Sequence, residues 1–315
     1  ACRMSGTVRR RVVIIAASIW IFRAYFSLPE AIRDAEGRPA AALQGFHHWL
    51  QQTYKTIDAL NEAWGNVFWS QEYGHFRDIG LPLAVTETNP AHRMAFRRFS
   101  SDQVRLFSDE QAHILRQYSK PDVWLTHNFM GNFIDFDHYP VMQALDIASW
   151  DSYPLGFLDQ GWFSDAQNSR YRRTGHPDWA AFHHDLYRGV GNGRFGVMEQ
   201  QPGAVNWATN NAEPLPGMVR LWSMEAVAHG AEFVSWFRWR QAPFAQEQMH
   251  AGLLHHAASP ARGSLAETAL RVAHASLPET STRQSPVALI FDYEASWLTD
   301  IHPHRAGYEA LHVAF

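Results

Sequence analysis

Four short β-compatible segments alternate with helical stretches through the middle of the chain, and this alternation restricts the fold more than any other feature. The segments are Val123–Met130, Asp146–Tyr153, Phe195–Glu199 and Glu232–Arg240. Helical patterns such as Asp102–Tyr118 and Val219–His229 lie between or before them. Strands that alternate with helices predict a parallel sheet, so we expect an α/β fold of the (β/α)8 TIM barrel type.

The predicted carboxyl ends of these segments carry polar and aromatic side chains. They present Asn128, Asp151 with Tyr153, Glu199, and Phe237 with Trp239. In a (β/α)8 barrel the catalytic residues gather at this edge. The placement suits a sugar pocket, because hydroxyls need polar partners and ring faces pack on aromatic side chains.

Glu199 is the first candidate for a catalytic residue. Arg194–Met198 is short, largely apolar and β-compatible, and Pro202–Gly203 breaks the chain directly afterwards. We therefore expect Glu199 at the end of a strand, because a charge within the strand would have to be buried and paired. The alternative to a catalytic carboxylate is a structural Glu in a buried ion pair.

The composition agrees with a sugar-binding protein without requiring one. A formal net charge of −4 suggests no nucleic-acid partner. The chain holds 13 Trp, far more than ordinary usage, and aromatic faces stack on sugar rings. The simpler interpretation is a Trp-rich core, in which only the Trp residues beside the carboxylates contact sugar.

Metal binding is not indicated. Cys2 is the only cysteine, so the chain can form neither an internal disulfide nor a cysteine-based zinc site. The 18 His contain no HExxH pattern, and neighbours such as His47 and His48 point in different directions on a helix or strand. We predict no metal and no cofactor.

Besides the Glu199 segment Val197–Trp207, seven blocks covering about two hundred residues carry a recognisable pattern. The blocks are Phe46–Tyr54, Leu60–Tyr73, Phe96–Asp102, Thr126–Gly131, Ser149–Pro154, Pro216–Gln241 and Glu247–Leu254. In this order they resemble the family 42 glycoside hydrolases, which are retaining β-galactosidases. The resemblance identifies the four β-compatible segments as barrel strands five to eight.

By this resemblance Glu199 is the nucleophile of the reaction. Retaining hydrolysis uses two carboxyl groups about 5 to 5.5 Å apart, one attacking the anomeric carbon and the other protonating the departing oxygen. Glu199 would form a galactosyl-enzyme, and water would then release galactose with its β configuration retained.

The resemblance also implies aromatic substrate contacts. Trp207 matches a substrate-contacting Trp that stacks or donates through its indole N–H. Tyr153 would donate to the nucleophile's carboxylate and orient it. Trp69 lies in a block where the family brings an aromatic residue to a pocket rim, sometimes across a subunit interface.

Glu247 and His250 resemble the family's motif for binding the non-reducing galactose. Their spacing puts both on one face of a helical turn, where they would hold adjacent hydroxyls. An exposed Glu-His pair on a helix is the simpler interpretation of these two alone. Beside the matched segment that contains Phe237, which we also assign to the substrate, sugar binding is favoured.

The N-terminal residues depart from the family. The family's general acid/base is the Glu of an Asn-Glu motif on strand four, and the usual spacing back from Phe46 leads to Leu28 or its neighbour, where no such motif stands. Glu30 and Glu36 are the nearest carboxylates. Residues 1–40 are therefore an unmatched leader, whose apolar run Val12–Phe22 is a signal peptide, a buried strand or sequence without a structural role.

Residues 41–277 are expected to form a partial catalytic barrel. Pro278–Pro286 is a polar linker between prolines, and Val287–Tyr293 is expected to be the first strand of a flavodoxin-like trimerisation domain. Residues 278–315 would thus be the linker and the start of that domain. The chain would be a fragment that covers the second half of the barrel.

The predicted function is hydrolysis of terminal non-reducing β-D-galactosides with retention. Two alternatives stay open: a catalytically inactive fragment that lacks the general acid/base, and a related retaining glycosidase acting on arabinosides or fucosides. The expected partner is a β-galactoside, with no nucleic acid and no membrane. The resemblance implies a homotrimer, and we expect the protein in the cytoplasm.

Overall fold

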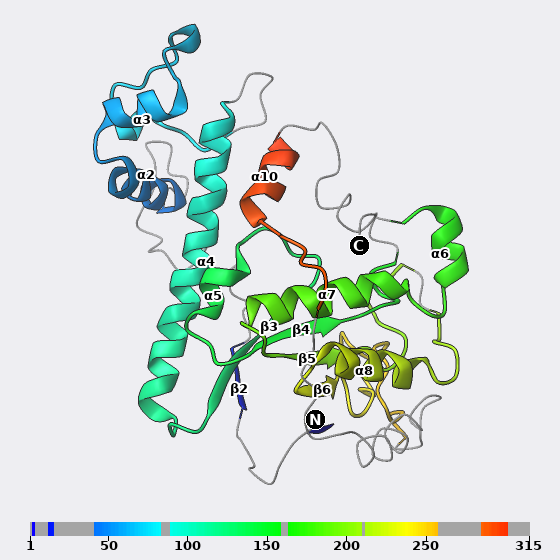
Figure 1. Cartoon of the computed structure of the whole chain (residues 1–315). Helices are drawn as coiled ribbons and strands as arrows, with labels where there is room; N and C mark the ends of the chain where they lie inside the picture. The colour runs from blue at the N-terminus through cyan, green and yellow to red at the C-terminus, as the bar shows by residue number, and fades with distance from the viewer. Residues whose placement is uncertain are drawn as a thin grey trace.

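A six-stranded sheet forms the centre of the computed structural model, with strand order β1-β6-β5-β4-β3-β2 (Figure 1). The strands are β1 (Cys2–Arg3), β2 (Val12–Ile15), β3 (Trp124–Met130), β4 (Ala148–Ser152), β5 (Phe195–Gln200) and β6 (Phe233–Trp236). Neighbouring strands run parallel except β1, which pairs antiparallel with β6. The structure describes residues 2–3, 12–15, 41–82, 89–158, 163–209, 212–257 and 285–301.

The predicted strands are confirmed in place and direction, with shifted ends. β6 ends at Trp236, four residues before the predicted end at Arg240, and β4 begins at Ala148 rather than Asp146. Every residue of β4 is buried, as expected for a strand inside a parallel sheet. The order and direction of β3 to β6 bring their carboxyl ends to one edge of the sheet.

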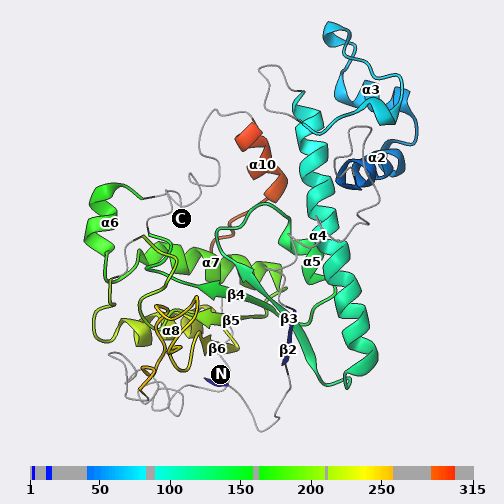
Figure 2. The same cartoon turned by 180° about the vertical axis from the view of Figure 1, so that it is seen from behind.

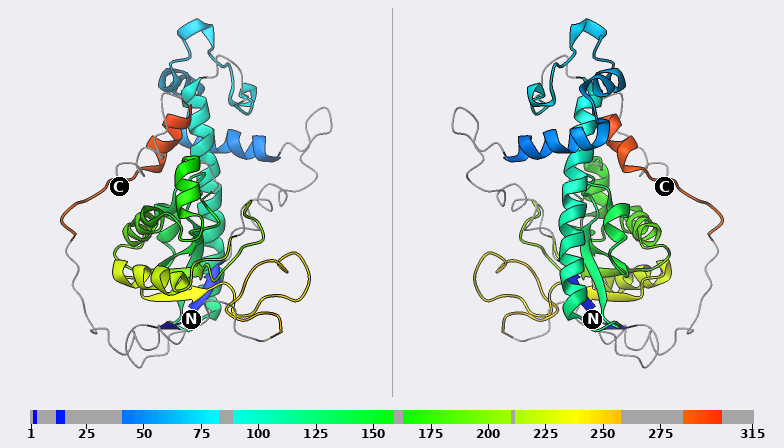
Figure 3. Two further views of the ribbon diagram at one scale, coloured as in Figure 1. Left: turned by 90° about the vertical axis from the view of Figure 1, so that its right-hand side faces the viewer. Right: turned by 90° about the vertical axis from the view of Figure 1, so that its left-hand side faces the viewer.

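Helices lie against one face and one edge of the sheet and extend beyond it (Figure 1 and Figure 3). They are α2 (Ala41–Tyr54), α3 (Ile57–Trp64), α4 (Pro90–Tyr118), α5 (His138–Met142), α6 (Asp165–Tyr171), α7 (Pro177–Val190), α8 (Met218–His229) and α10 (Tyr293–Ile301), with single 3-10 turns at η1 (Phe68–Ser70) and η2 (Phe76–Asp78). Helices α7 and α8 cover one face of the sheet, and the loop of residues 237–250 projects on the other side (Figure 3). We call these the helix face and the loop face.

The helix face of the sheet is held by aromatic packing. Trp150 of β4 stacks on two rings of α7, with centroid distances of 5.3 Å to His183 and 5.5 Å to Tyr187. Phe129 of β3 stacks on the same Tyr187 at 5.7 Å. These side chains are nearly or fully buried, and each large ring removes much apolar surface from water, so they stabilise the central layer.

Helix α4 is 29 residues long and begins twelve residues before the predicted start at Asp102. The Asn89 side chain caps its first turn by accepting a hydrogen bond from the Ala91 amide at 2.9 Å, and Pro90 occupies the first helical position. Both features are typical of a helix start. The extension carries α4 past the sheet and gives α2 and α3 a surface to pack on (Figure 2).

A second core lies in this helical lobe, away from the sheet. Its buried members are Phe46, Leu50, Leu60, Trp64, Ile79, Ala95 and Phe99. Helix α3 is bounded by Thr56, whose hydroxyl accepts from the Ala59 amide, and by Gly65 in the left-handed conformation at φ 65°. Glycine adopts that conformation at little cost, so the sequence stops α3 there.

The predicted strand Val287–Tyr293 is wrong. Residues 285–292 form no strand, and Tyr293 begins α10 instead. Among the described residues no strand lies beside this segment to supply a ladder of hydrogen bonds, whereas Asp292 accepts from the Glu294 amide and starts a helix. Trp297 of α10 is buried, and Glu294 receives two hydrogen bonds from Arg98 of α4.

The leader contributes a strand. Val12–Ile15 is β2 and runs parallel to β3, with Ile15 opposite His127. The strand interpretation of this apolar run is confirmed for these four residues. Leu28, Glu30 and Glu36 lie outside the described residues, as does most of the predicted linker. Within the described ranges no helix has both the length and the apolar character needed to span a bilayer.

Candidate active site

Three polar residues lie on neighbouring strands near the carboxyl edge of the sheet. Asn128 of β3 donates from its amide to the Asp151 carboxylate of β4 at 3.3 Å, and Asp151 is opposite Glu199 of β5 in the strand register. Ser149, two residues before Asp151 on the same face, stands opposite Asn128 in the register, and its hydroxyl contacts Thr126 at 2.8 Å. The sheet therefore presents a polar row on its loop face.

Glu199 reaches this face because of a β-bulge. Trp150 pairs with Val197, but the next residue, Asp151, pairs with Glu199, so Met198 is an extra residue in β5. In a regular strand Val197 and Glu199 would point to the same side. The bulge turns Glu199 to the side of Asp151, while Val197 stays with Trp150 on the helix face.

Tyr153 holds the Glu199 carboxylate. Its hydroxyl donates to Glu199 Oε2 at 2.5 Å, which is a short, charge-assisted hydrogen bond. Burial raises the pKa of Glu199, the bond from Tyr153 lowers it, and the charge of Glu247 raises it, with a net upward direction. Burial and the charge of Glu199 raise the pKa of Tyr153, so its hydroxyl keeps its proton and stays a donor.

Trp207 forms a side wall beside Tyr153. The two rings meet edge to face with centroids 5.4 Å apart, and the Phe157 ring lies 5.1 Å from the indole on another side. A Cβ on Gly156 would stand 2.4 Å from the indole edge, so only glycine lets Trp207 lie this close to the backbone. Trp207 as a whole residue is 41% exposed.

His250 and Phe237 close the wall on the other side of Tyr153. The His250 ring packs edge to face on Tyr153 at 5.8 Å and on Phe237 at 5.1 Å. It is buried, its Nε2 has no partner among the described residues, and burial lowers its pKa, which favours the neutral ring. A neutral imidazole with an unused nitrogen is suited to bind a hydroxyl.

Glu247 lies on the rim of the same group. Its carboxylate pairs with Arg238 Nη1 at 3.1 Å, and the His250 amide donates to the Glu247 carbonyl at 3.0 Å. The segment is a turn and not the helix of the simpler interpretation. Glu247 and His250 thus lie in a turn, with His250 buried and Glu247 partly exposed.

Gln201 is a structural residue of the site that the sequence analysis did not identify. Its side-chain oxygen accepts from the Leu155 amide at 2.9 Å, and its side-chain nitrogen donates to the Gly203 carbonyl at 2.8 Å. Gln201 thereby ties the loop after β4 to the loop after β5. A polar residue directly after the strand, two positions beyond the Glu199 carboxylate, is the only signal that could have suggested this.

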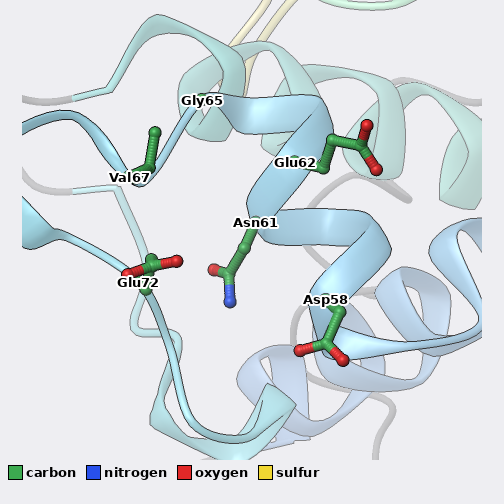
Figure 4. Close-up of a pocket in the computed structure, with 6 residues that line it drawn as sticks. All are labelled: Asp58, Asn61, Glu62, Gly65, Val67 and Glu72. Carbon is green, nitrogen blue, oxygen red and sulfur yellow. The ribbon is translucent and has the colours of Figure 1, made fainter.

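We call the residues around the proposed nucleophile the Glu199 group: Asn128, Asp151, Tyr153, Glu199, Trp207, Phe237, Glu247 and His250. Trp69 is not part of the Glu199 group. It lies in η1 of the helical lobe with 64% of its surface exposed. The same lobe holds an open pocket of about 420 Å³ lined by Asp58, Asn61, Glu62, Gly65, Val67 and Glu72 (Figure 4). Figure 4 shows acidic side chains on α3 and on the segment facing it, with no aromatic ring among the labelled residues. This pocket and the Glu199 group are separate features.

The family model for β-galactosidases of glycoside hydrolase family 42 matches residues 34–274 of the chain. The chain belongs to glycoside hydrolase family 42. The strands β3 to β6 are thus the recognisable strands five to eight of the family's (β/α)8 barrel, and β2 lies beside β3, on the side where strand four would stand.

Individual family 42 relatives support the assignment over most of the chain. The β-galactosidase of Thermus thermophilus is 55% identical over 273 residues, which is 86% of this chain and 42% of that protein. The β-galactosidase structure from Marinomonas ef1 is 51% identical with a TM-score of 0.79, and covers 87% of this chain and 43% of that one. The β-galactosidase structure from Halorubrum lacusprofundi is 40% identical with a TM-score of 0.82, and covers 92% of this chain and 43% of that one.

This family 42 chain spans less than half the length of those relatives. The residues matched by the family model include the whole Glu199 group, from Asn128 to His250. In the described ranges no three His, Cys, Asp or Glu side chains come together in a way that could hold a metal ion.

Proposed function

We propose that this chain carries the nucleophile half of a retaining β-galactosidase active site, with Glu199 as the nucleophile. One observation supports this most directly: the Glu199 carboxylate stands at the carboxyl edge of a barrel sheet and accepts a 2.5 Å hydrogen bond from Tyr153. A donor at this distance fixes one carboxylate oxygen and leaves the other free to attack. The relatives that bear the name β-galactosidase supply the substrate class.

The proposed chemistry begins with attack of Glu199 on the anomeric carbon of a terminal β-galactoside. A bond forms between the carboxylate oxygen and this carbon, and the bond to the leaving oxygen breaks. Water then cleaves the galactosyl ester, so that galactose leaves with its β configuration. The general acid/base of both steps is not assigned to any described residue.

The surrounding residues are proposed to bind the sugar. Trp207 would stack on the ring through its exposed face, while Phe237 forms the opposite wall. Glu247 and His250 would hold neighbouring hydroxyls, Glu247 as an acceptor and His250 through its unpartnered Nε2. Tyr153 orients the nucleophile.

Further proposals concern the whole protein and rest on resemblance. It would assemble as a homotrimer through a second domain that begins within residues 278–315, and it would act in the cytoplasm. Trp69, exposed on the helical lobe, would then meet the substrate pocket of a neighbouring subunit.

The test is the intact mass of the purified chain after incubation with a 2-deoxy-2-fluoro-β-galactoside bearing a dinitrophenyl leaving group. This group departs without a general acid, so the reaction reports the nucleophile alone. We expect a gain of one fluorogalactosyl unit that is lost in Glu199→Gln and kept in Glu110→Gln, a matched change on the exposed surface of α4. Folded, soluble chain that gains no mass would refute the proposal.

A further inference from the structure

Asp151 is a second carboxyl group directly beside the proposed nucleophile. It stands opposite Glu199 in the register of β4 and β5, and adjacent strands lie about 4.8 Å apart. Both side chains point to the loop face, as does Asn128 on β3. Two acidic side chains thus occupy neighbouring positions in one row.

The surroundings of Asp151 supply little to balance a negative charge. Its residue surface is only 4% exposed, and its Oδ1 has no hydrogen-bond partner among the described residues. The other oxygen has one donor, the Asn128 amide, at a long 3.3 Å. In the described part of the chain neither Asp151 nor Glu199 forms an ion pair, and Arg238 pairs with Glu247 instead.

The surroundings of Glu199 stabilise a negative charge better than those of Asp151 do. It is less buried than Asp151 and receives the short hydrogen bond from Tyr153. Two adjacent carboxyl groups in a site of low polarity cannot both ionise readily, so one proton stays with the pair. The environment favours the charge on Glu199 and the proton on Asp151.

We propose that Asp151 is a positioning residue that holds a proton beside Glu199, so that the nucleophile alone carries the negative charge of the pair. The proton on Asp151 leaves a neutral carboxylic acid in the buried position. This inference rests on the proposed function of Glu199 and adds to it a role for Asp151.

The electrostatics of the neighbouring groups agree with this geometry. Burial, and then the charge of Glu199, hold the pKa of Asp151 well above its ordinary value, while the Asn128 hydrogen bond acts in the opposite direction. The titratable groups that face the pair are Tyr153 on the segment after β4, which keeps its proton, and Glu247 on the loop of residues 237–250.

The first experiment compares the unmodified chain with Asp151→Asn, which reproduces the shape of the protonated acid but has no proton to lose. The rate of labelling by the dinitrophenyl 2-fluorogalactoside is measured against pH. We expect Asp151→Asn to label within about threefold of the unmodified rate and to keep the acid limb of the profile within roughly 0.3 pH units. A substitution that only disturbed the structure would lower the labelling rate without moving the acid limb of the pH profile.

An acid limb displaced to lower pH by about one unit or more would overturn the proposal. It would mean that the substitution removed a negative charge, and hence that Asp151 is ionised beside Glu199. Circular dichroism and a thermal melt of Asp151→Asn establish that the variant is folded.

A second measurement needs no change at Asp151. An infrared spectrum of the Glu225→Gln chain at pH 7 should contain the carbonyl stretch of a protonated carboxylic acid. The Glu225→Gln background is used because burial raises the pKa of Glu225 to about 7, which would add a band of its own near neutrality. Absence of the band would overturn the proposal even if Asp151→Asn does not fold.

These two readouts separate the two proposals. If the folded, unmodified chain is not labelled at any pH, the nucleophile assignment fails. Absence of the infrared band would then still overturn the proposal on Asp151.

Discussion

Acid should destabilise this fold through His127, a buried histidine on β3. The ring is 3% exposed, and neither of its nitrogens has a hydrogen-bond partner among the described residues. It stacks on Phe129 with centroids 4.9 Å apart. Burial lowers its pKa from 6.5 to about 4, opposed by the nearby backbone of Asn128.

Acid lowers the free energy of unfolding because the pKa of His127 is lower in the folded chain than in the unfolded chain. Between pH 6.5 and 4 the unfolded chain binds a proton at His127 and the folded chain does not, so the free energy of unfolding falls as the pH falls. The contribution is fully present above pH 6.5. Between pH 7 and pH 5 the loss amounts to about 2 kcal/mol for this one histidine.

The perturbation that isolates this contribution is His127→Leu. It removes a titrating ring whose nitrogens are unsatisfied, so stability at pH 7 should change by less than about 1 kcal/mol. The decrease in unfolding free energy from pH 7 to pH 5 should be smaller than in the unmodified chain by about 2 kcal/mol. His183 is a poorer choice, because carbonyl oxygens lie 2.7 Å from both of its ring nitrogens and would accept from a charged ring.

The assay is urea denaturation at pH 7 and pH 5, followed by circular dichroism. His48→Leu, on the exposed side of α2, controls for the loss of an imidazole. If His127→Leu and His48→Leu show the same pH dependence as the unmodified chain, the reasoning on His127 is refuted.

Two further predictions concern the Glu199 group. Tyr153→Phe removes the hydrogen bond that lowers the pKa of Glu199, so the acid limb of the labelling profile should move up by about one pH unit and the best rate should fall about tenfold. An unchanged limb would mean that this bond does not act on ionisation. Gly156→Ala places a Cβ 2.4 Å from the Trp207 indole, so we expect labelling at least about tenfold slower, with a melting temperature within roughly 3 °C of the unmodified chain. Equal labelling rates would show that the position of Trp207 is not needed.

The alternation of strands and helices was sufficient to predict the sheet from the sequence. Strand β5 was predicted within one residue, because apolar residues lead up to Glu199 and Pro202–Gly203 follow it. The family blocks then assigned Glu199, Tyr153 and Trp207 to one site. The structure brings these three side chains together.

Other features depend on contacts that a local pattern does not contain. The bulge at Met198 decides which face Glu199 reaches, and strand periodicity alone gives the opposite side. Val287–Tyr293 has the composition of a strand, but a strand also needs a neighbour, and Tyr293 instead begins a helix that packs on α4. Gln201 matters through the two loops that it joins.

The central claim is that Glu199 is the nucleophile, and the most direct test is the site of the covalent label. The chain is incubated with the dinitrophenyl 2-fluorogalactoside, digested, and sequenced by tandem mass spectrometry. The account predicts that the fluorogalactosyl mass lies on Glu199 within the peptide that spans β5. A label on Asp151, on Glu247 or on any other residue would contradict it.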